Sequence, residues 1–210
     1  MTEIRTDTKT AAGNHLCQWL FNPFRFVAGY KALLSGLGVI LISEFVGSFG
    51  NTHFDGVLDV HTGLEAPLWF FFAEGLINWI CMAVPLFFFG LIVSRSSFRA
   101  IDVFGTQALA RGPYLIAAVA MLPDANRRFG EYLMAKLTQA APTVAINYAD
   151  VLIFVFAIIL IILMAVWMVA LMYRAYAVSC NIKGAKAIAT FIVSLIGAEV
   201  LSKAVILQLF

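Results

Sequence analysis

Two histidines and two aspartates lie close together in a polar stretch between two apolar runs. His53-x-Asp55 is followed by Asp59-x-His61, so the second pair mirrors the first. If Gly56 to Leu58 form a turn, each histidine comes beside its own aspartate and the two pairs can meet. Two imidazoles and two carboxylates suit a divalent transition metal such as zinc or manganese. The alternative is a capped, hydrogen-bonded loop, because Asp-Gly is an ordinary turn signal.

Glutamates and their polar neighbours interrupt the apolar runs. Glu44 lies about seven residues before the end of one run and Glu74 about seven after the start of the next. Both are then about 10 Å deep if the runs are antiparallel helices rising 1.5 Å per residue. Glu199 lies at a similar depth in the last run, one turn from Lys203, while Asn78 is one turn from Glu74. The spacing predicts an intramembrane polar cluster of these five residues beneath the His/Asp loop.

This polar cluster has two interpretations. A charged side chain within a span costs about 2.5 to 3.5 kcal/mol on insertion scales, so each needs a partner or a purpose. In the functional interpretation, the glutamates share a proton or hold a cation in a transport pathway. In the structural interpretation, Glu199 pairs with Lys203. The other two glutamates then accept hydrogen bonds from Ser43, Ser48 or Asn78 as contacts between helices.

The elements that must position these residues are apolar helices. The chain has 210 residues, of which 62% are hydrophobic and 12% charged, whereas soluble domains are about 25% charged. About 20 helical residues cross a hydrocarbon core about 30 Å thick, and these runs lack the alternation of barrel strands. We expect one all-α, polytopic transmembrane helical bundle in residues 16–210, after a disordered polar N-terminus over residues 1–15. Its five spans are expected near residues 32–49, 67–93, 105–122, 151–173 and 185–207.

Three further segments complete this expectation. Leu16 to Phe26 is short, aromatic and interrupted by Asn22-Pro23, which predicts an interfacial helix. The third span is expected to bend at Gly112-Pro113, and a re-entrant segment is the alternative. Phe129 to Ala140 is expected to form an amphipathic helix.

Lysine and arginine are distributed unevenly over the predicted loops. With the N-terminus inside, ten of the 14 lie on the inner side and four on the outer side. The positive-inside rule then predicts an inner-membrane protein with a cytoplasmic N-terminus and a C-terminus outside. The inner side holds a basic rim that either binds anionic lipid headgroups or only fixes the topology: Arg95, Arg99, Arg111, Lys183 and Lys186.

Other functional classes lack their signatures. The net charge of +2 comes without a dense basic cluster, which argues against nucleic acid. GxSxG, HExxH and GxxxxGKS are missing, so we expect neither an enzyme nor a cofactor beyond a metal in the loop. Cys17, Cys81 and Cys180 lack metal spacing and imply no disulfide. A stripe of small residues in the last span predicts a packing helix or a homo-oligomer face: Thr190, Ser194, Ala198 and Ser202.

The order of these features is similar to that of a known family. An aromatic Asn-Pro segment (Trp19 to Phe26) precedes five spans, and the third carries Arg111-Gly112-Pro113-Tyr114. Over residues 19–207 this resembles the bacterial branch of the YIP-domain family, named for Ypt/Rab-interacting proteins. The resemblance implies a five-helix inner-membrane protein without established catalysis. Eukaryotic relatives bind small GTPases through an Asp-Leu-Tyr-Gly-Pro motif that this chain lacks, so GTPase binding is not carried over.

Three functional hypotheses follow. The first is a non-enzymatic, YIP-like membrane protein that contacts lipids or proteins in membrane organisation or trafficking-like scaffolding. The second is an ion- or proton-coupled transporter or channel that uses the intramembrane glutamates. The third is a metal-dependent enzyme at the outer face, built on the His/Asp loop. A cavity that reaches the glutamates favours the second hypothesis, and a tightly packed core favours the first.

Overall fold

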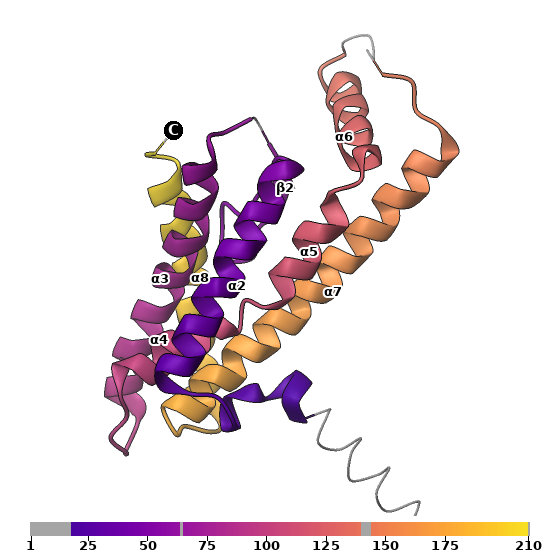
Figure 1. Ribbon diagram of the computed structural model, residues 1–210. Helices are drawn as coiled ribbons and strands as arrows, with labels where there is room; N and C mark the ends of the chain where they lie inside the picture. The colour runs from indigo at the N-terminus through magenta and orange to yellow at the C-terminus, as the bar shows by residue number, and fades with distance from the viewer. Residues whose placement is uncertain (1–17, 64, 140–143, 210) are drawn as a thin grey trace, which may run out of the picture.

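The computed structural model describes residues 18–63, 65–139 and 144–209 (Figure 1). The predicted disordered segment 1–15 and Cys17 lie outside the described residues. Along the chain the elements are the 3₁₀-helix η1 (Pro23–Arg25), α2 (Gly29–Phe49), β1 (Thr52–His53), β2 (His61–Thr62), α3 (Leu68–Val93), α4 (Ala100–Leu109), α5 (Pro113–Met121), α6 (Asp124–Leu137), α7 (Tyr148–Ser179) and α8 (Ala185–Ile206).

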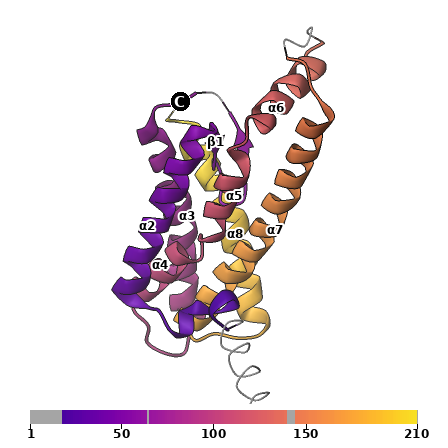
Figure 2. The ribbon, with the colours of Figure 1, turned by 45° about the vertical axis from the view of Figure 1, so that its right-hand side comes forward.

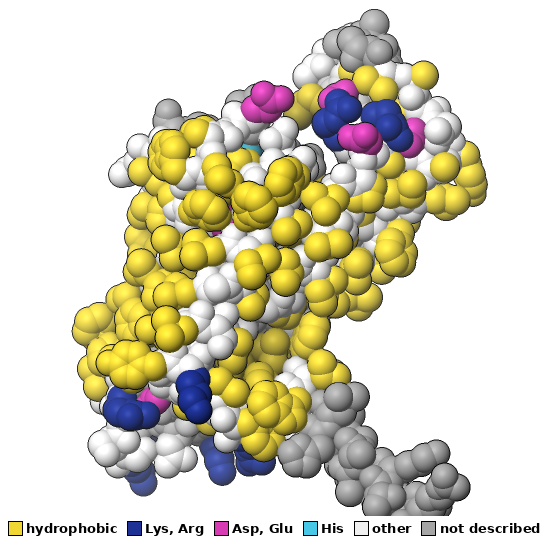
Figure 3. Space-filling view, in the orientation of Figure 1, with side chains coloured by type: hydrophobic (Ala, Val, Ile, Leu, Met, Phe, Trp, Pro, Cys, Tyr) yellow, Lys and Arg dark blue, Asp and Glu magenta, His cyan; other side chains and the backbone are white. Residues whose placement is uncertain are grey.

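Four helices, α2, α3, α7 and α8, are long and apolar enough to cross a membrane. They have 21, 26, 32 and 22 residues, and at 1.5 Å per residue even the shortest measures about 32 Å, the thickness of a hydrocarbon core. Apolar side chains cover the surface between the charged ends in Figure 3. This exterior is consistent with a membrane protein. The predicted all-α class is confirmed apart from one short β-hairpin, and the number of spans stays a prediction.

The two ends of the bundle differ. At the hairpin end, β1 and β2 lie antiparallel between the end of α2 and the start of α3, pairing Thr52 with Thr62 and His53 with His61. At the opposite end, named the basic end, α3 finishes, α4 begins and α7 connects to α8 (Figure 1). Lysine and arginine side chains gather along this end in Figure 3.

The predicted kinked third span consists of two short helices. Pro113 starts α5 at the first helical position, where its missing N–H is not needed, and so the chain breaks after α4. The start of α4 lies near Gly29, at the start of α2, and the end of α5 lies near Gly50, just after α2. The pair α4–α5 therefore runs from the basic end to the hairpin end beside α2. Neither helix alone, at 10 and 9 residues, has the length of a span.

Glycines allow α2 and α4 to approach closely. A Cβ added to Gly36 would lie 2.4 Å from the backbone nitrogen of Leu109, and one added to Gly105 would lie 2.8 Å from the carbonyl oxygen of Gly29. Such contacts leave no room for any side chain. As in other membrane helix pairs, small residues set the distance between the backbones.

Helix α6 and the first turns of α7 extend away from the other helices (Figures 1 and 2). Helix α6 spans Asp124–Leu137 rather than the predicted 129–140, because Pro123 ends the previous helix and Asp124 suits a first turn. Asn147 and Asp150 form a capping box that starts α7. Arg128 joins the two helices through an ion pair of 2.5 Å with Asp150.

The small residues of α8 face the inside of the bundle. Ser194, Ala198 and Ser202 are buried, and α8 packs mainly on α3. The stripe therefore serves packing within the chain, which was the first of the two predicted alternatives. A homo-oligomer through the remaining surface of α8 stays a prediction.

The predicted interfacial helix is interrupted. Residues 18–21 are helical and η1 follows, with Asn22 between them. Pro23 lacks the N–H that would continue the first helix. Trp19 stacks on Phe26 with ring centroids 4.9 Å apart, and Trp167 of α7 donates a 3.1 Å hydrogen bond to the carbonyl of Leu20. This segment is thus held against α7.

Candidate functional site

The loop between β1 and β2 folds inward between the helix ends at the hairpin end. Phe54 and Val57 have no exposed surface, and His53 is buried. Phe54 stacks on Tyr114 of α5, with ring centroids 4.6 Å apart. We call residues 52–62 the inserted loop. A loop in this position carries backbone polar groups into apolar surroundings, so they need partners there.

Three helices supply those partners. Asn78 of α3 donates to the carbonyl oxygen of Phe54. Tyr114 of α5 donates a 2.7 Å hydrogen bond to the carbonyl of Val57. The N–H of Leu58 donates to Glu199 of α8 at 2.9 Å. The inserted loop is therefore tied to α3, α5 and α8 at once, which fixes the position of its histidines.

His53 and Glu74 form a buried pair. The Nδ1 atom of His53 lies 3.1 Å from both carboxylate oxygens of Glu74, and the exposed fractions of the two residues are 2% and 1%. Phe71 stacks on the imidazole at 4.5 Å between ring centroids. A carboxylate held against Nδ1 orients the imidazole ring.

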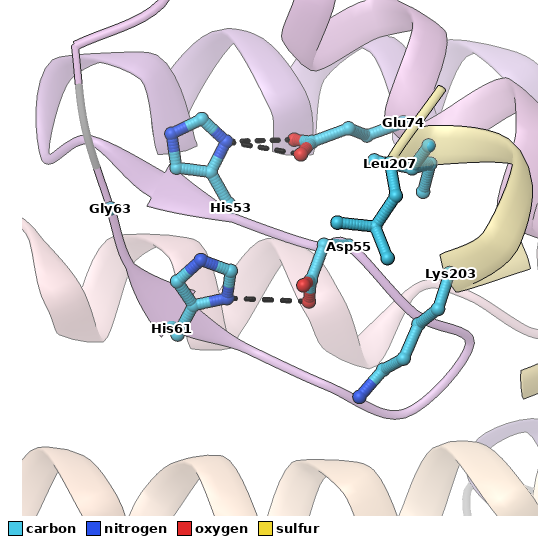
Figure 4. Close-up of a pocket in the computed structure, with 8 residues that line it drawn as sticks. His53, Asp55, His61, Gly63, Glu74, Lys203 and Leu207 are labelled. Atoms are coloured by element: carbon cyan, nitrogen blue, oxygen red, sulfur yellow. Dashed lines mark hydrogen bonds and ion pairs between the residues drawn. The ribbon is translucent and has the colours of Figure 1, made fainter. Parts of the chain in front are cut away.

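His61 and Asp55 form a second, more exposed pair. Their side chains come within 3.3 Å, and the His61 ring stacks beside that of His53 at 5.7 Å (Figure 4). The hydrogen bond from His61 lowers the pKa of Asp55. The same hydrogen bond raises the pKa of His61. Lys203, at the same pocket, forms ion pairs of 2.6 Å with Asp59 and 3.4 Å with Glu199.

The two histidine pairs line a pocket of about 310 Å³ at the hairpin end. Figure 4 shows His53 and His61 one above the other, each with one ring nitrogen turned to its carboxylate, and Lys203 on the far side. Gly63 closes the pocket behind the rings. A Cβ on this glycine would lie 3.2 Å from Nε2 of His53 and 3.3 Å from Nε2 of His61. The pocket therefore reaches the buried His53–Glu74 pair.

Glu44 lies behind this pair. It is buried, and a Cβ on Gly75 would lie only 2.4 Å from its Oε1 atom, so its carboxylate rests on the backbone next to Glu74. Its Oε2 atom has no hydrogen-bond partner among the described residues, and neither has Nη2 of Arg111. Both residues line a void of about 10 Å³ together with Tyr114. A void of that size holds about one water molecule.

The structure corrects several predicted contacts. His53 pairs with Glu74 rather than Asp55, and His61 pairs with Asp55 rather than Asp59. These partners come from α3 and from the part of the loop that follows β1, because the loop folds inward instead of turning on itself. Among the described residues, no three His, Cys, Asp or Glu side chains gather in an arrangement that would hold a metal ion.

The predicted five-residue polar cluster is divided in two. Glu44 and Glu74 are neighbours, but Glu199 turns to the inserted loop and to Lys203, whose ion pair was one of the predictions. Ser43 and Ser48 donate to the carbonyls of their own helix rather than to a glutamate. Asn78 binds the loop backbone. The loop residues therefore separate the two acidic sites.

The predicted basic rim is also revised. Arg111 is buried between helices beside Tyr114 and is absent from the surface of the basic end. Arg99 forms an ion pair of 2.9 Å with Asp102. Arg95, Lys183 and Lys186 are exposed.

Tyr114, Gly75 and Gly63 belong to the site but were not predicted from the sequence. A tyrosine in an apolar run was the one available signal, since a buried hydroxyl usually has a partner.

The exposed histidine pair predicts a pH-dependent contribution to stability. Below the ordinary histidine pKa of about 6.5 the raised pKa of His61 stabilises the fold, and this contribution is lost as the pH rises through the folded-state value. The lowered pKa of Asp55 acts above its ordinary value of about 3.9 and is lost at lower pH. An NMR titration of His61 should therefore give a lower midpoint in Asp55→Asn. An unchanged midpoint would contradict the pairing.

Comparison of the chain with protein-family models, curated proteins and solved structures gives no match. The resemblance to the YIP-domain family therefore stays a prediction.

Proposed function

We propose that the protein is a proton-coupled membrane protein that takes up and releases protons at His53, Glu74 and Glu44. In this proposal the bundle has five spans, with α4–α5 as the third, and lies in the inner membrane with its hairpin end outside. The observation that carries the proposal is a buried imidazole–carboxylate pair that forms the wall of an open pocket and has a second buried carboxylate directly behind it.

The geometry supports transfer in two steps. Protons from solution reach the His53–Glu74 pair through the pocket that also holds His61 and Asp55. His53 contacts Glu74 through Nδ1, so the two side chains can share a proton without either of them moving. Glu44 packs against the backbone of Gly75, the residue that follows Glu74, and lies beside a void that accommodates about one water molecule. In this proposal that water exchanges a proton with Glu44, at a void that Arg111 and Tyr114 also line.

The charges also suit reversible binding of one proton. With His53 neutral and both glutamates ionised, the cluster carries two negative charges against the single positive charge of Arg111. With His53 protonated, the four groups sum to zero. Because charges in such surroundings interact strongly, a proton added to one of these groups affects the other three. One added proton therefore brings it to neutrality.

The test is proton flux into vesicles. Purified protein is reconstituted with a pH-sensitive dye inside, and a pH gradient is imposed. We expect Glu74→Gln and Glu44→Gln each to reduce the protein-dependent flux at least about tenfold, because an amide cannot exchange the proton. Glu65→Gln removes an exposed carboxylate at the same end and should leave the flux unchanged. Wild-type flux equal to that of protein-free vesicles would refute the proposal.

A YIP-like role in membrane organisation is the second candidate. It is favoured by α7, because only 11% of its apolar 18-residue stretch is buried within the chain. The helix thus offers a long surface to lipid or to another protein. This function requires neither catalysis nor flux. It would become the leading proposal if the vesicles show no flux.

A further inference from the structure

A hollow of about 370 Å³ opens at the basic end between residues 22–25 and the α7–α8 connection. Three cations and no acidic residue line it: Arg25, Arg174 and Lys183. All three are exposed, and none forms an ion pair within the part of the chain that the structure describes. Three like charges around one hollow create a positive potential that attracts an anion.

The backbone at this hollow adds to that potential. The α7–α8 connection turns through left-handed conformations at Asn181 (φ 50°) and Gly184 (φ 74°), and both residues line the hollow. Gly184 is also the N-cap of α8, which has neither a side-chain cap nor an acidic residue in its first turn. The first N–H groups of a helix carry partial positive charge and bind phosphate readily.

A second, apolar hollow of about 380 Å³ borders the same N-terminal segment. Trp19 and Pro23 line it from that segment, and Trp167 and Leu171 line it from α7. Arg174, in the basic hollow, is seven residues from Trp167, or about 10 Å along the helix axis. Moving inward from the basic end, a molecule would thus meet cations first and apolar surface next.

We infer that these two hollows form a site for one anionic glycerophospholipid. Its phosphate binds Arg25, Arg174 and Lys183, and one acyl chain lies in the apolar hollow. The order of charge and apolar surface along α7 matches the order of headgroup and chain in a lipid leaflet. Free phosphate or a soluble anion would use the first hollow alone. This inference does not rest on proton coupling. Two of its three cations also lie outside the basic rim predicted from the sequence.

Native mass spectrometry of the full chain, released from detergent, tests the site. Phosphatidylglycerol and phosphatidylcholine with the same acyl chains compete for the protein, and the ratio of their adducts is measured. We expect wild type to prefer phosphatidylglycerol. Arg25→Gln, Arg174→Gln and Lys183→Gln together should reduce that preference at least about tenfold, since three attractive contacts to the anionic headgroup are lost.

The matched control removes three other exposed cations of the basic end: Lys31→Gln, Arg95→Gln and Lys186→Gln. It has the same net charge as the test variant and should keep the preference. Equal loss in both variants would overturn the inference, because it indicates diffuse attraction to the whole end. Glycerol phosphate, which has no acyl chain, should not displace the bound lipid. Displacement by glycerol phosphate would assign the site to a soluble anion instead.

Discussion

Gly36→Ala should destabilise the protein by about 3 kcal/mol, near the upper end of the usual cost of overpacking. The new Cβ would lie 2.4 Å from the nitrogen of Leu109, 2.5 Å from the carbonyl carbon of Ala108 and 2.6 Å from its Cβ. Two of these three atoms are backbone, so no rotation of a side chain relieves the collision. Helix α4 has to move away from α2, and Arg111 and Tyr114 move with it. The midpoint of thermal unfolding in detergent measures the effect.

Gly38 provides the matched control, since it lies two residues further along α2 and has open space around its Cβ position. Alanine is favoured over glycine within a helix by about 0.5 to 1 kcal/mol. Gly38→Ala should therefore leave the midpoint unchanged or raise it slightly. If both variants behave alike, the close contact between α2 and α4 does not exist in the folded protein.

Tyr114→Phe is expected to have the second-largest effect, about 1 to 3 kcal/mol, which is the cost of leaving a buried acceptor unsatisfied. The substitution removes one oxygen atom and preserves the ring that stacks on Phe54. The carbonyl of Val57, in a residue without exposed surface, then loses its donor. Because the inserted loop carries His53, the loss should also loosen the His53–Glu74 pair. We expect a lower unfolding midpoint and faster hydrogen exchange in the loop.

Tyr148→Phe is the control for this loss, because Tyr148 is 78% exposed at the start of α7. Removing its hydroxyl leaves no buried group without a partner, so stability should change by less than about 0.5 kcal/mol. Hydrogen exchange that stays slow throughout residues 52–62 in Tyr114→Phe would show that Asn78 and Glu199 hold the loop without the tyrosine.

The long apolar helices could be predicted because their hydropathy distinguishes them from the rest of the chain. The expected spans 67–93 and 185–207 agree with α3 (Leu68–Val93) and α8 (Ala185–Ile206) within one residue at each end. The expected span 151–173 was too short, since α7 runs over Tyr148–Ser179. Its capping box starts it earlier, and its last turn continues past Arg174, where the apolar run ends but the helix does not.

The site could be predicted only in part, because its contacts depend on the direction in which one loop folds. The histidines, aspartates and glutamates were identified from their types and their cost in an apolar chain. Their partners were not, since His53 and Glu74 are 21 residues apart and meet only when the loop enters the bundle. Spacing rules describe neighbours along one helix or turn. They do not describe a loop inserted among helices.

The position of the inserted loop also determines when the fold can be completed during synthesis. The N–H of Leu58 finds its acceptor on Glu199, 141 residues later in the chain. At about 5 to 20 residues per second, the ribosome needs about 7 to 28 s to make that stretch. During this time α3 to α7 are made while the inserted loop lacks one of its three attachments. Insertion of α8 is therefore the step that closes the hairpin end, and the pocket cannot form before it.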